Sequence, residues 1–116
     1  MTDFLHSKNL TGFSIVLLGM GGDGHIASLF PDTPTPKADE LVVATESPVE
    51  PKQRISLTNS TIFSAKRVYF IIKGSAKAEI IAQVFGAAER KYPAQAYLDA
   101  TAKVSWFIDA EAATKL

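Results

Sequence analysis

The sequence predicts an α/β fold in which helices cover both faces of a parallel sheet. Residues 13–18 and 68–72 are almost continuously apolar and have the length of strands that are buried on both sides. Between the second of these segments and a third strand expected at 104–108, residues 76–90 carry apolar side chains at helical spacing. Strands that alternate with helices are typical of a parallel sheet.

Shorter elements complete the predicted fold. Residues 1–12 are polar and are expected to form a leader before the first strand. Two further short strands are expected, at 41–45 and 54–57. Caps and apolar spacing predict four more helical segments: from 25 or 26 to 30, ended by Pro31; from a Thr58 or Asn59 cap to about 65; from Pro93 to 98; and from an Asp109 cap to 116.

Composition and charge exclude several classes of function. Twelve basic residues balance twelve acidic ones, whereas proteins that bind nucleic acids or anionic membranes carry a basic excess. The chain has no cysteine, which excludes disulfides and thiolate metal sites. Its apolar runs are far shorter than a membrane span, and its first residues have no signal-peptide pattern. We therefore expect a cytoplasmic protein whose anion site, if it has one, is local.

The 116 residues allow one domain at most. Three strong strands make a thin parallel sheet, and the predicted helices would lack a full surface to cover. We therefore expect the chain to be part of a larger domain.

The strongest functional signal directly follows the first predicted strand. Four glycines, Gly19, Gly21, Gly22 and Gly24, lie within a few positions of one another. Glycines in such a turn allow positive φ angles or close approach of the backbone to a ligand. Their spacing matches neither the dinucleotide-binding fingerprint nor a P-loop. A tight turn without a ligand remains an alternative explanation of the glycines.

His25 and Asp23 make this turn a candidate active site. A histidine at the amino-terminal end of a helix experiences the positive end of the helix dipole, which favours the neutral imidazole. A neutral imidazole accepts a proton and suits a general base. Asp23 either orients the imidazole through a hydrogen bond or caps the following helix.

Two cations are candidates for binding an anion. Lys77 lies in the first turn of the helix predicted at 76–90, where its charge opposes the helix dipole. A phosphate bound there would remove the conflict. Arg54 begins a predicted strand after a proline-rich loop and can point to the same edge of the sheet. The alternative for both residues is an ordinary side chain that extends into solvent.

Residues 18–31 read Leu-Gly-Met-Gly-Gly-Asp-Gly-His-Ile-Ala-Ser-Leu-Phe-Pro and closely resemble the signature of 6-phosphogluconolactonases. Further motifs that resemble this family follow in the right order, at 54–58, 74–78, 93–94 and 104–113. Family members are usually about twice as long as this chain. The resemblance therefore implies that residues 1–116 are the C-terminal portion of one three-layer Rossmann-like domain, incomplete here, with helices on both faces of its sheet.

The resemblance also implies a reaction, the hydrolysis of 6-phosphogluconolactone in the pentose phosphate pathway, without metal or cofactor. His25 would activate a water, Asp23 would support His25, and backbone N–H groups of the glycine turn would stabilise the oxyanion. Arg54 and Lys77 match positions that hold the phosphate of the substrate. The absent half would supply the rest of the phosphate site, so the isolated chain is expected to be inactive, to self-associate or to pair with that half.

Two alternatives stay open at this point. Glucosamine-6-phosphate deaminases share the Gly-x-Asp-Gly-His core, but they resemble Ile-Ala-Phe-Asn-Glu-Pro after the histidine, and Phe30 stands here in the place of that acid. The lactonase interpretation is therefore favoured over a deaminase. The second alternative is a non-catalytic half-domain that binds a phosphosugar without turnover.

Overall fold

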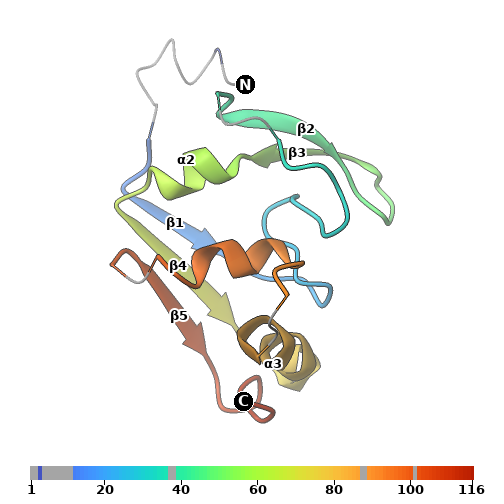
Figure 1. Cartoon of the computed structure of the whole chain (residues 1–116), viewed down its shortest axis with the longest axis vertical. Helices are drawn as coiled ribbons and strands as arrows, with labels where there is room; N and C mark the ends of the chain where they lie inside the picture. The colour runs from blue at the N-terminus through green and yellow to red at the C-terminus, as the bar shows by residue number, and fades with distance from the viewer. Residues whose placement is uncertain (1–2, 4–11, 37–38, 87–88, 101) are drawn as a thin grey trace.

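The computed structural model describes residues 3, 12–36, 39–86, 89–100 and 102–116. Its elements are strands β1 (Ile15–Leu18), β2 (Val42–Glu46), β3 (Gln53–Leu57), β4 (Arg67–Ile72) and β5 (Val104–Ile108), helices α2 (Asn59–Phe63) and α3 (Ala78–Gly86), and the 3₁₀ helices η1 (Ser75–Lys77) and η2 (Pro93–Tyr97) (Figure 1). The described helices are all short, and none of them is long and apolar enough to cross a membrane.

Strands β1, β4 and β5 form a parallel sheet in the order β1-β4-β5. This confirms the predicted α/β class and the three strong strands. Because parallel strands end at the same edge, the turns that follow β1 and β4 and the first residue after β5 lie together. The Asp109 carboxylate accepts the Gly74 N–H at 3.1 and 3.2 Å, and the Lys77 ammonium donates to the Met20 carbonyl at 2.7 Å. This carboxyl edge is where open α/β sheets place their ligands.

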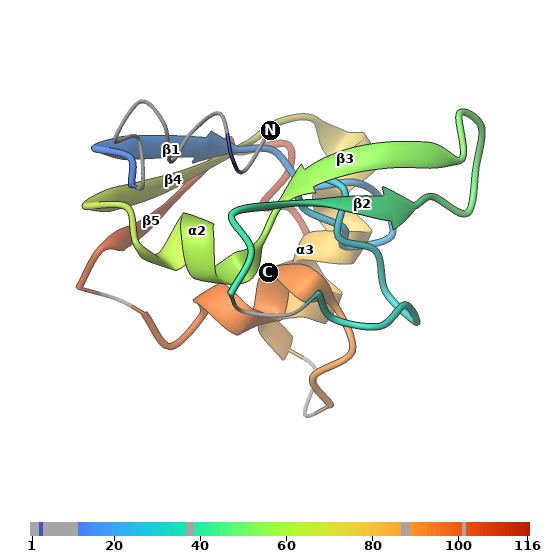
Figure 2. The same ribbon diagram turned by 90° about the horizontal axis from the view of Figure 1, so that it is seen from above.

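The other two strands form a separate unit. Strands β2 and β3 were expected at nearly these positions, and they pair antiparallel with each other, outside the parallel sheet. The hairpin lies beside the carboxyl edge of the main sheet (Figures 1 and 2). It leads directly into α2, whose first turn is capped by the Thr58 hydroxyl, which accepts the Thr61 N–H at 3.2 Å.

One face of the parallel sheet carries the core. Helices α2, α3 and η2 all lie on this side of the sheet (Figure 2). Phe70 of β4 is fully buried there, stacks on Trp106 with ring centroids 3.9 Å apart, and meets the edge of Tyr97 at 5.6 Å. The other buried sheet residues on this face are Val16, Leu18, Val68, Ile72 and Val104.

The opposite face of the sheet is apolar and open. We name it the open face and define it by its exposed large apolar side chains, which are Ile15, Leu17, Ile71 and Phe107, exposed by 53, 63, 54 and 56%. No described helix covers them, so in the part of the chain that the structure describes, helices lie on one face of the sheet only, as expected of an incomplete three-layer domain. The strands are apolar at successive positions, which indicates two buried faces without showing which segment supplies the second layer.

Two predicted helices do not form. Between residues 25 and 30 the chain reverses instead: Ile26 and Leu29 exchange backbone hydrogen bonds at 2.8 and 3.3 Å, and Ala27 adopts a φ of +48°. After Asp109 the chain forms turns rather than a helix, although the Asp109 carboxylate does accept the Ala112 N–H at 2.8 Å. The helix predicted at 76–90 is η1 followed by α3, which ends at Gly86, and the predicted leader falls almost wholly outside the described residues.

Candidate active site

The turn after β1 is held by its own backbone and by η2. The Gly21 N–H donates to the His25 carbonyl and the Gly24 N–H donates to the Gly21 carbonyl, both at 2.9 Å. Gly24 has a φ of +81°, and a side chain there would lie 2.6 Å from the ring of Tyr92. The Ala94 N–H donates to the Gly24 carbonyl at 3.3 Å. Glycine at this position therefore serves both the turn and its close contact with the segment at 92–94.

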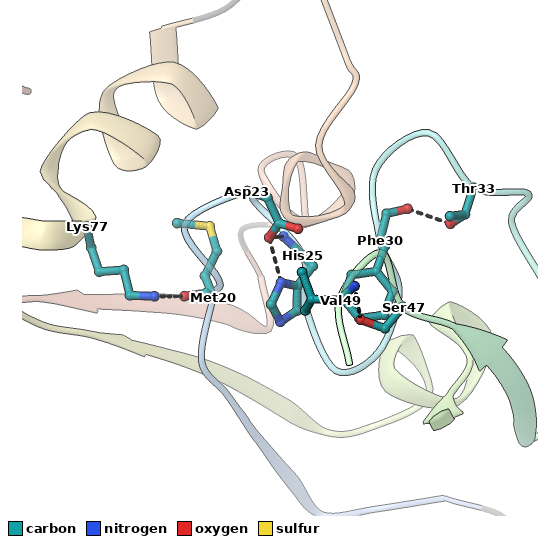
Figure 3. A network of polar contacts seen from close by, with 8 residues as sticks. All are labelled: Met20, Asp23, His25, Phe30, Thr33, Ser47, Val49 and Lys77. Atoms are coloured by element: carbon teal, nitrogen blue, oxygen red, sulfur yellow. Dashed lines mark hydrogen bonds and ion pairs between the residues drawn. The ribbon is translucent and has the colours of Figure 1, made fainter. Parts of the chain in front are cut away.

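Asp23 and His25 form the hydrogen bond that the sequence predicted as one of two options. The Asp23 Oδ1 lies 2.5 Å from the Nδ1 of His25 and also accepts the His25 backbone N–H at 3.1 Å (Figure 3). Partial burial by itself raises the pKa of Asp23, but the hydrogen bonds from His25 and the charge of its ring outweigh this, so the pKa falls below the ordinary value. The carboxylate thus stays ionised and fixes the imidazole, which leaves Nε2 as the nitrogen that can take a proton.

The missing side chain of Gly21 is the space that the imidazole occupies. A Cβ on Gly21 would lie 2.1 Å from both Nδ1 and Cε1 of His25, and 2.8 Å from the Asp23 carboxylate. A Cβ on Gly19 or Gly22 would meet no atom within 4 Å. The four glycines of the motif are therefore not equivalent, a distinction that their spacing could not reveal.

Lys77 contacts the glycine turn near its beginning, at Met20. Its Nζ donates to the Met20 carbonyl at 2.7 Å (Figure 3). The Gly74 N–H that begins this segment is held by the Asp109 carboxylate, whose pKa is lowered by the N–H bonds from Ala112 and Gly74. The lysine is thus placed by two strand ends at the carboxyl edge of the sheet, rather than extending freely into solvent.

Arg54 approaches the site through Phe30 instead. Its guanidinium carbon lies 5.9 Å from the centre of the Phe30 ring, and its Nε donates to the Pro51 carbonyl at 2.5 Å. The same Phe30 ring lies 4.8 Å from the imidazole of His25, centre to centre. The structure therefore links Arg54 and Lys77 to different parts of the site, one through Phe30 and one through Met20.

Two hollows adjoin the turn. One of about 960 Å³ lies between the segment 28–36, strand β2 and η2, and Phe30 belongs to its lining while Asp23 and His25 do not. A smaller one of about 540 Å³ reaches Asp23. The smaller hollow thus reaches the His25–Asp23 pair, which combines a proton acceptor with a carboxylate that stays ionised. Within the described ranges, no three His, Cys, Asp or Glu side chains gather as metal ligands.

Sequence reasoning missed several residues that shape the site. Tyr92 packs against Gly24, and the buried Ser56 accepts the Ser28 N–H at 3.0 Å. Ser56 carried a usable signal, because the alternation of strand β3 places it on the same face as Arg54. Tyr92 carried no such signal, since its contact with Gly24 depends on how η2 folds back onto the turn.

The fold and the pair together define a class: an α/β protein with a hydrogen-bonded histidine–aspartate pair on a glycine turn at the carboxyl edge of a parallel sheet. The family model for glucosamine-6-phosphate isomerases and 6-phosphogluconolactonase matches residues 1–106, and the chain belongs to this family.

Among curated proteins, the chain is 44% identical over 103 residues to the GDH/6PGL endoplasmic bifunctional protein of Oryctolagus cuniculus, covering 86% of this chain and 13% of that protein. It is 38% identical over 107 residues to the 6-phosphogluconolactonase of Homo sapiens, covering 90% of this chain and 41% of that enzyme. The chain thus spans less than half the length of these relatives.

Solved structures show the same relationship. The devB protein superposes with a TM-score of 0.80 at 33% identity, covering 90% of this chain and 45% of that one. The 6-phosphogluconolactonase of Trypanosoma brucei gives a TM-score of 0.70 at 30% identity, covering 90% and 42%. A monomeric glucosamine-6-phosphate deaminase gives a TM-score of 0.76 at 25% identity, covering 99% and 52%. These comparisons confirm the family resemblance and the fold class that the sequence predicts.

Proposed function

We propose that this chain is the general-base portion of a 6-phosphogluconolactonase, which hydrolyses 6-phospho-D-glucono-1,5-lactone to 6-phosphogluconate. The observation that carries the proposal is the 2.5 Å hydrogen bond between Asp23 and Nδ1 of His25 on the glycine turn. The names of the curated relatives, including the 6-phosphogluconolactonase of Homo sapiens, support the substrate.

In the proposed reaction, Nε2 of His25 takes a proton from a water as the water attacks the lactone carbonyl. The Asp23 carboxylate stabilises the imidazolium that forms, and the proton then passes to the ring oxygen as the acyl–oxygen bond breaks. The N–H groups of Gly21 and Gly24 are already bonded within the turn. We therefore assign the developing oxyanion to the Gly22 N–H, while Gly19, Gly21 and Gly24 shape the turn that presents it.

We propose that Lys77 and Arg54 bind the phosphate of the substrate. Lys77 uses one N–H on the Met20 carbonyl, and its ammonium group has three. Arg54 uses its Nε on the Pro51 carbonyl, and its two terminal nitrogens carry four more N–H groups. Both cations therefore keep donors for an anion while they are held in place.

A deaminase is the second candidate, because a solved glucosamine-6-phosphate deaminase shares this fold. Phe30 argues against it. The ring is 5% exposed and packs against His25, so the position that the resemblance assigns to an acid in deaminases is apolar here. A proton carrier for ring opening is missing at that position.

The open face bears on whether the chain works alone. Fully burying a side chain such as Leu17 or Phe107 stabilises a protein by about 1.5–3 kcal/mol, so a cover over this face is strongly favoured. We propose that a polypeptide layer covers it, either the portion that the relatives possess beyond this match or a second copy of the chain. A non-catalytic phosphosugar-binding unit is the state expected when that cover is absent.

The test is hydrolysis of freshly prepared 6-phosphogluconolactone by the chain, or by the chain with its covering layer if turnover requires it, corrected for spontaneous hydrolysis. His25→Ala is the test variant and His6→Ala, at the only other histidine, is its control. We expect turnover that His25→Ala lowers about 10²–10⁴-fold and His6→Ala leaves intact. Equal turnover in both variants would exclude the assigned base, and release of ammonia from glucosamine 6-phosphate would favour the deaminase. A cytoplasmic location stays a prediction, to be tested by fractionating cells, because one relative is named as endoplasmic.

A further inference from the structure

The Phe30 ring contacts both the proposed general base, His25, and one of the two cations proposed to bind phosphate, Arg54. The imidazole of His25 lies 4.8 Å from the centre of the Phe30 ring, tilted by 39°. The guanidinium carbon of Arg54 lies 5.9 Å from the centre of the same ring. The ring is 5% exposed, so its position is set by the packing around it rather than by solvent.

The backbone on either side of Phe30 is also fixed. Before it, the Ile26–Leu29 reversal aims the chain at strand β3, and the Ser28 N–H donates to the hydroxyl of Ser56 at 3.0 Å. After it, the hydroxyl of Thr33 donates to the Phe30 carbonyl at 2.6 Å. The ring is therefore held at both ends of its own segment.

The Ser28–Ser56 hydrogen bond ties this segment to the strand that carries Arg54. Ser56 is 3% exposed, and its hydroxyl also donates to the Leu57 carbonyl at 2.9 Å. Because side chains two apart on a strand share a face, Ser56 and Arg54 lie on the same side of β3. Strand β3 is thus fixed to the His25 segment by the Ser28–Ser56 hydrogen bond, and Arg54, two residues before Ser56, contacts Phe30.

We propose that Phe30 is a positioning residue that sets the separation of the His25 imidazole from the Arg54 guanidinium, and so the preference for a phosphorylated lactone. This inference rests on the proposed lactonase function. Two ends of one substrate, the reacting carbonyl and the remote phosphate, must reach two protein groups at once, and a misplacement of about 1 Å at the reacting carbonyl is costly in rate. A buried ring between the two groups fixes their spacing more firmly than two flexible side chains would.

The kinetic test compares 6-phosphogluconolactone with unphosphorylated glucono-1,5-lactone. The measured quantity is the ratio of their kcat/KM values in the wild-type chain, in Phe30→Leu and in Phe85→Leu. Phe85 is a partly exposed ring on α3 that contacts Trp106, outside the site. We expect Phe30→Leu to lower the ratio severalfold, a size that loss of a cation–π contact at a partly exposed site can produce. We expect Phe85→Leu to leave it unchanged.

If Phe30 has a merely structural role, Phe30→Leu lowers kcat/KM for both lactones equally and leaves their ratio unchanged. That outcome would overturn the proposal. Ser56→Ala supplies a second variant that keeps the ring and removes only the tie to Ser28. We expect it to lower the ratio severalfold while it leaves kcat on the unphosphorylated lactone near wild type. An unchanged ratio in Ser56→Ala would likewise contradict the proposal.

A measurement without turnover separates this inference from the proposed function. Inorganic phosphate is titrated into the chain while the His25 ring signals are followed by NMR. We expect phosphate to shift those signals in the wild type and in Phe85→Leu, and several times less in Phe30→Leu. An equal shift in Phe30→Leu, or none in the wild type, refutes the inference. Absence of lactone hydrolysis by a wild type that shows the shift and has its open face covered refutes the proposed function alone.

Discussion

Replacing Gly21 by alanine should disable the site through a single steric conflict. The new Cβ would start 2.1 Å from Nδ1 and Cε1 of His25, and ordinary contact begins at 3.4 Å. The ring must therefore move by about 1.3 Å, away from a position that a 2.5 Å hydrogen bond to Asp23 now fixes. A misplacement of about 1 Å in a reacting group costs about 10²-fold in rate, so we expect kcat/KM to fall by that factor or more.

Gly22→Ala is the matched control for this prediction. It adds the same methyl group one residue later in the same turn, where no atom lies within 4 Å and φ is not in the left-handed region. Because the Gly22 N–H is also the proposed oxyanion donor, this control is compared on the Asp23–His25 hydrogen bond and on stability. We expect both to stay near wild type, since a surface substitution of this kind changes the free energy of unfolding by about 0.5 kcal/mol or less. The contrast between two neighbouring glycines removes any general effect of stiffening the turn.

The assay is lactone hydrolysis by the chain, or by the chain with its covering layer if turnover requires it. NMR of the proton on the His25 Nδ1 reports the Asp23 hydrogen bond independently of turnover. Gly21→Ala should lose or shift that signal and Gly22→Ala should keep it. A Gly21→Ala variant with an intact signal and normal activity would show that the imidazole does not occupy the space we assign to it.

Three further predictions concern the phosphate site, the strand ends and the open face. Lys77→Ala should mainly raise KM, because a remote phosphate contact stabilises the bound substrate and the transition state to a similar extent. Lys115→Ala on the exposed terminus should leave KM unchanged, and an unchanged KM in Lys77→Ala removes Lys77 from the site. The lowered pKa of Asp109 means that its stabilising effect is present above its ordinary pKa of 3.8 and is lost as the pH falls through the lower folded value. Asp109→Asn should therefore flatten the acid limb of a pH–stability curve measured by denaturant unfolding, and an unaltered limb contradicts the assignment. Leu17→Ser should weaken association in sedimentation more than Val49→Ser, a similarly exposed change outside the sheet, and equal effects would exclude the open face as the interface.

The strands of the main sheet could be predicted from the sequence because their signal is local. Residues 104–108 form β5 with the predicted bounds, and the two continuous apolar segments form β1 and β4. The helix expected at 25–30 could not be excluded locally, since its reversal depends on hydrogen bonds between Ile26 and Leu29 and on Ser56, far along the chain. The alanine-rich end after Asp109 favours helix by propensity, but a segment of that length is too short to be stable without tertiary packing.

The Asp23–His25 pair could be predicted from the sequence because its signal, like that of the strands, is local. Asp23 and His25 are two residues apart, so their hydrogen bond follows from a turn that the glycines already indicated. The roles of individual glycines depend on what faces each Cα, which only the folded turn determines.

The helix-dipole argument for a neutral His25 illustrates this limit, since no helix follows the turn in the structure. The orientation of the imidazole rests instead on Asp23 at Nδ1, on the space left by Gly21 and on the ring of Phe30. These three contacts come from residues 21–30, whereas Arg54 joins that segment through strand β3 and Lys77 bonds to Met20 just before it. The base can therefore be fully oriented within this chain while the phosphate contacts remain sensitive to the packing around them. Loss of the cover over the open face should consequently raise KM before it disturbs the Asp23–His25 hydrogen bond.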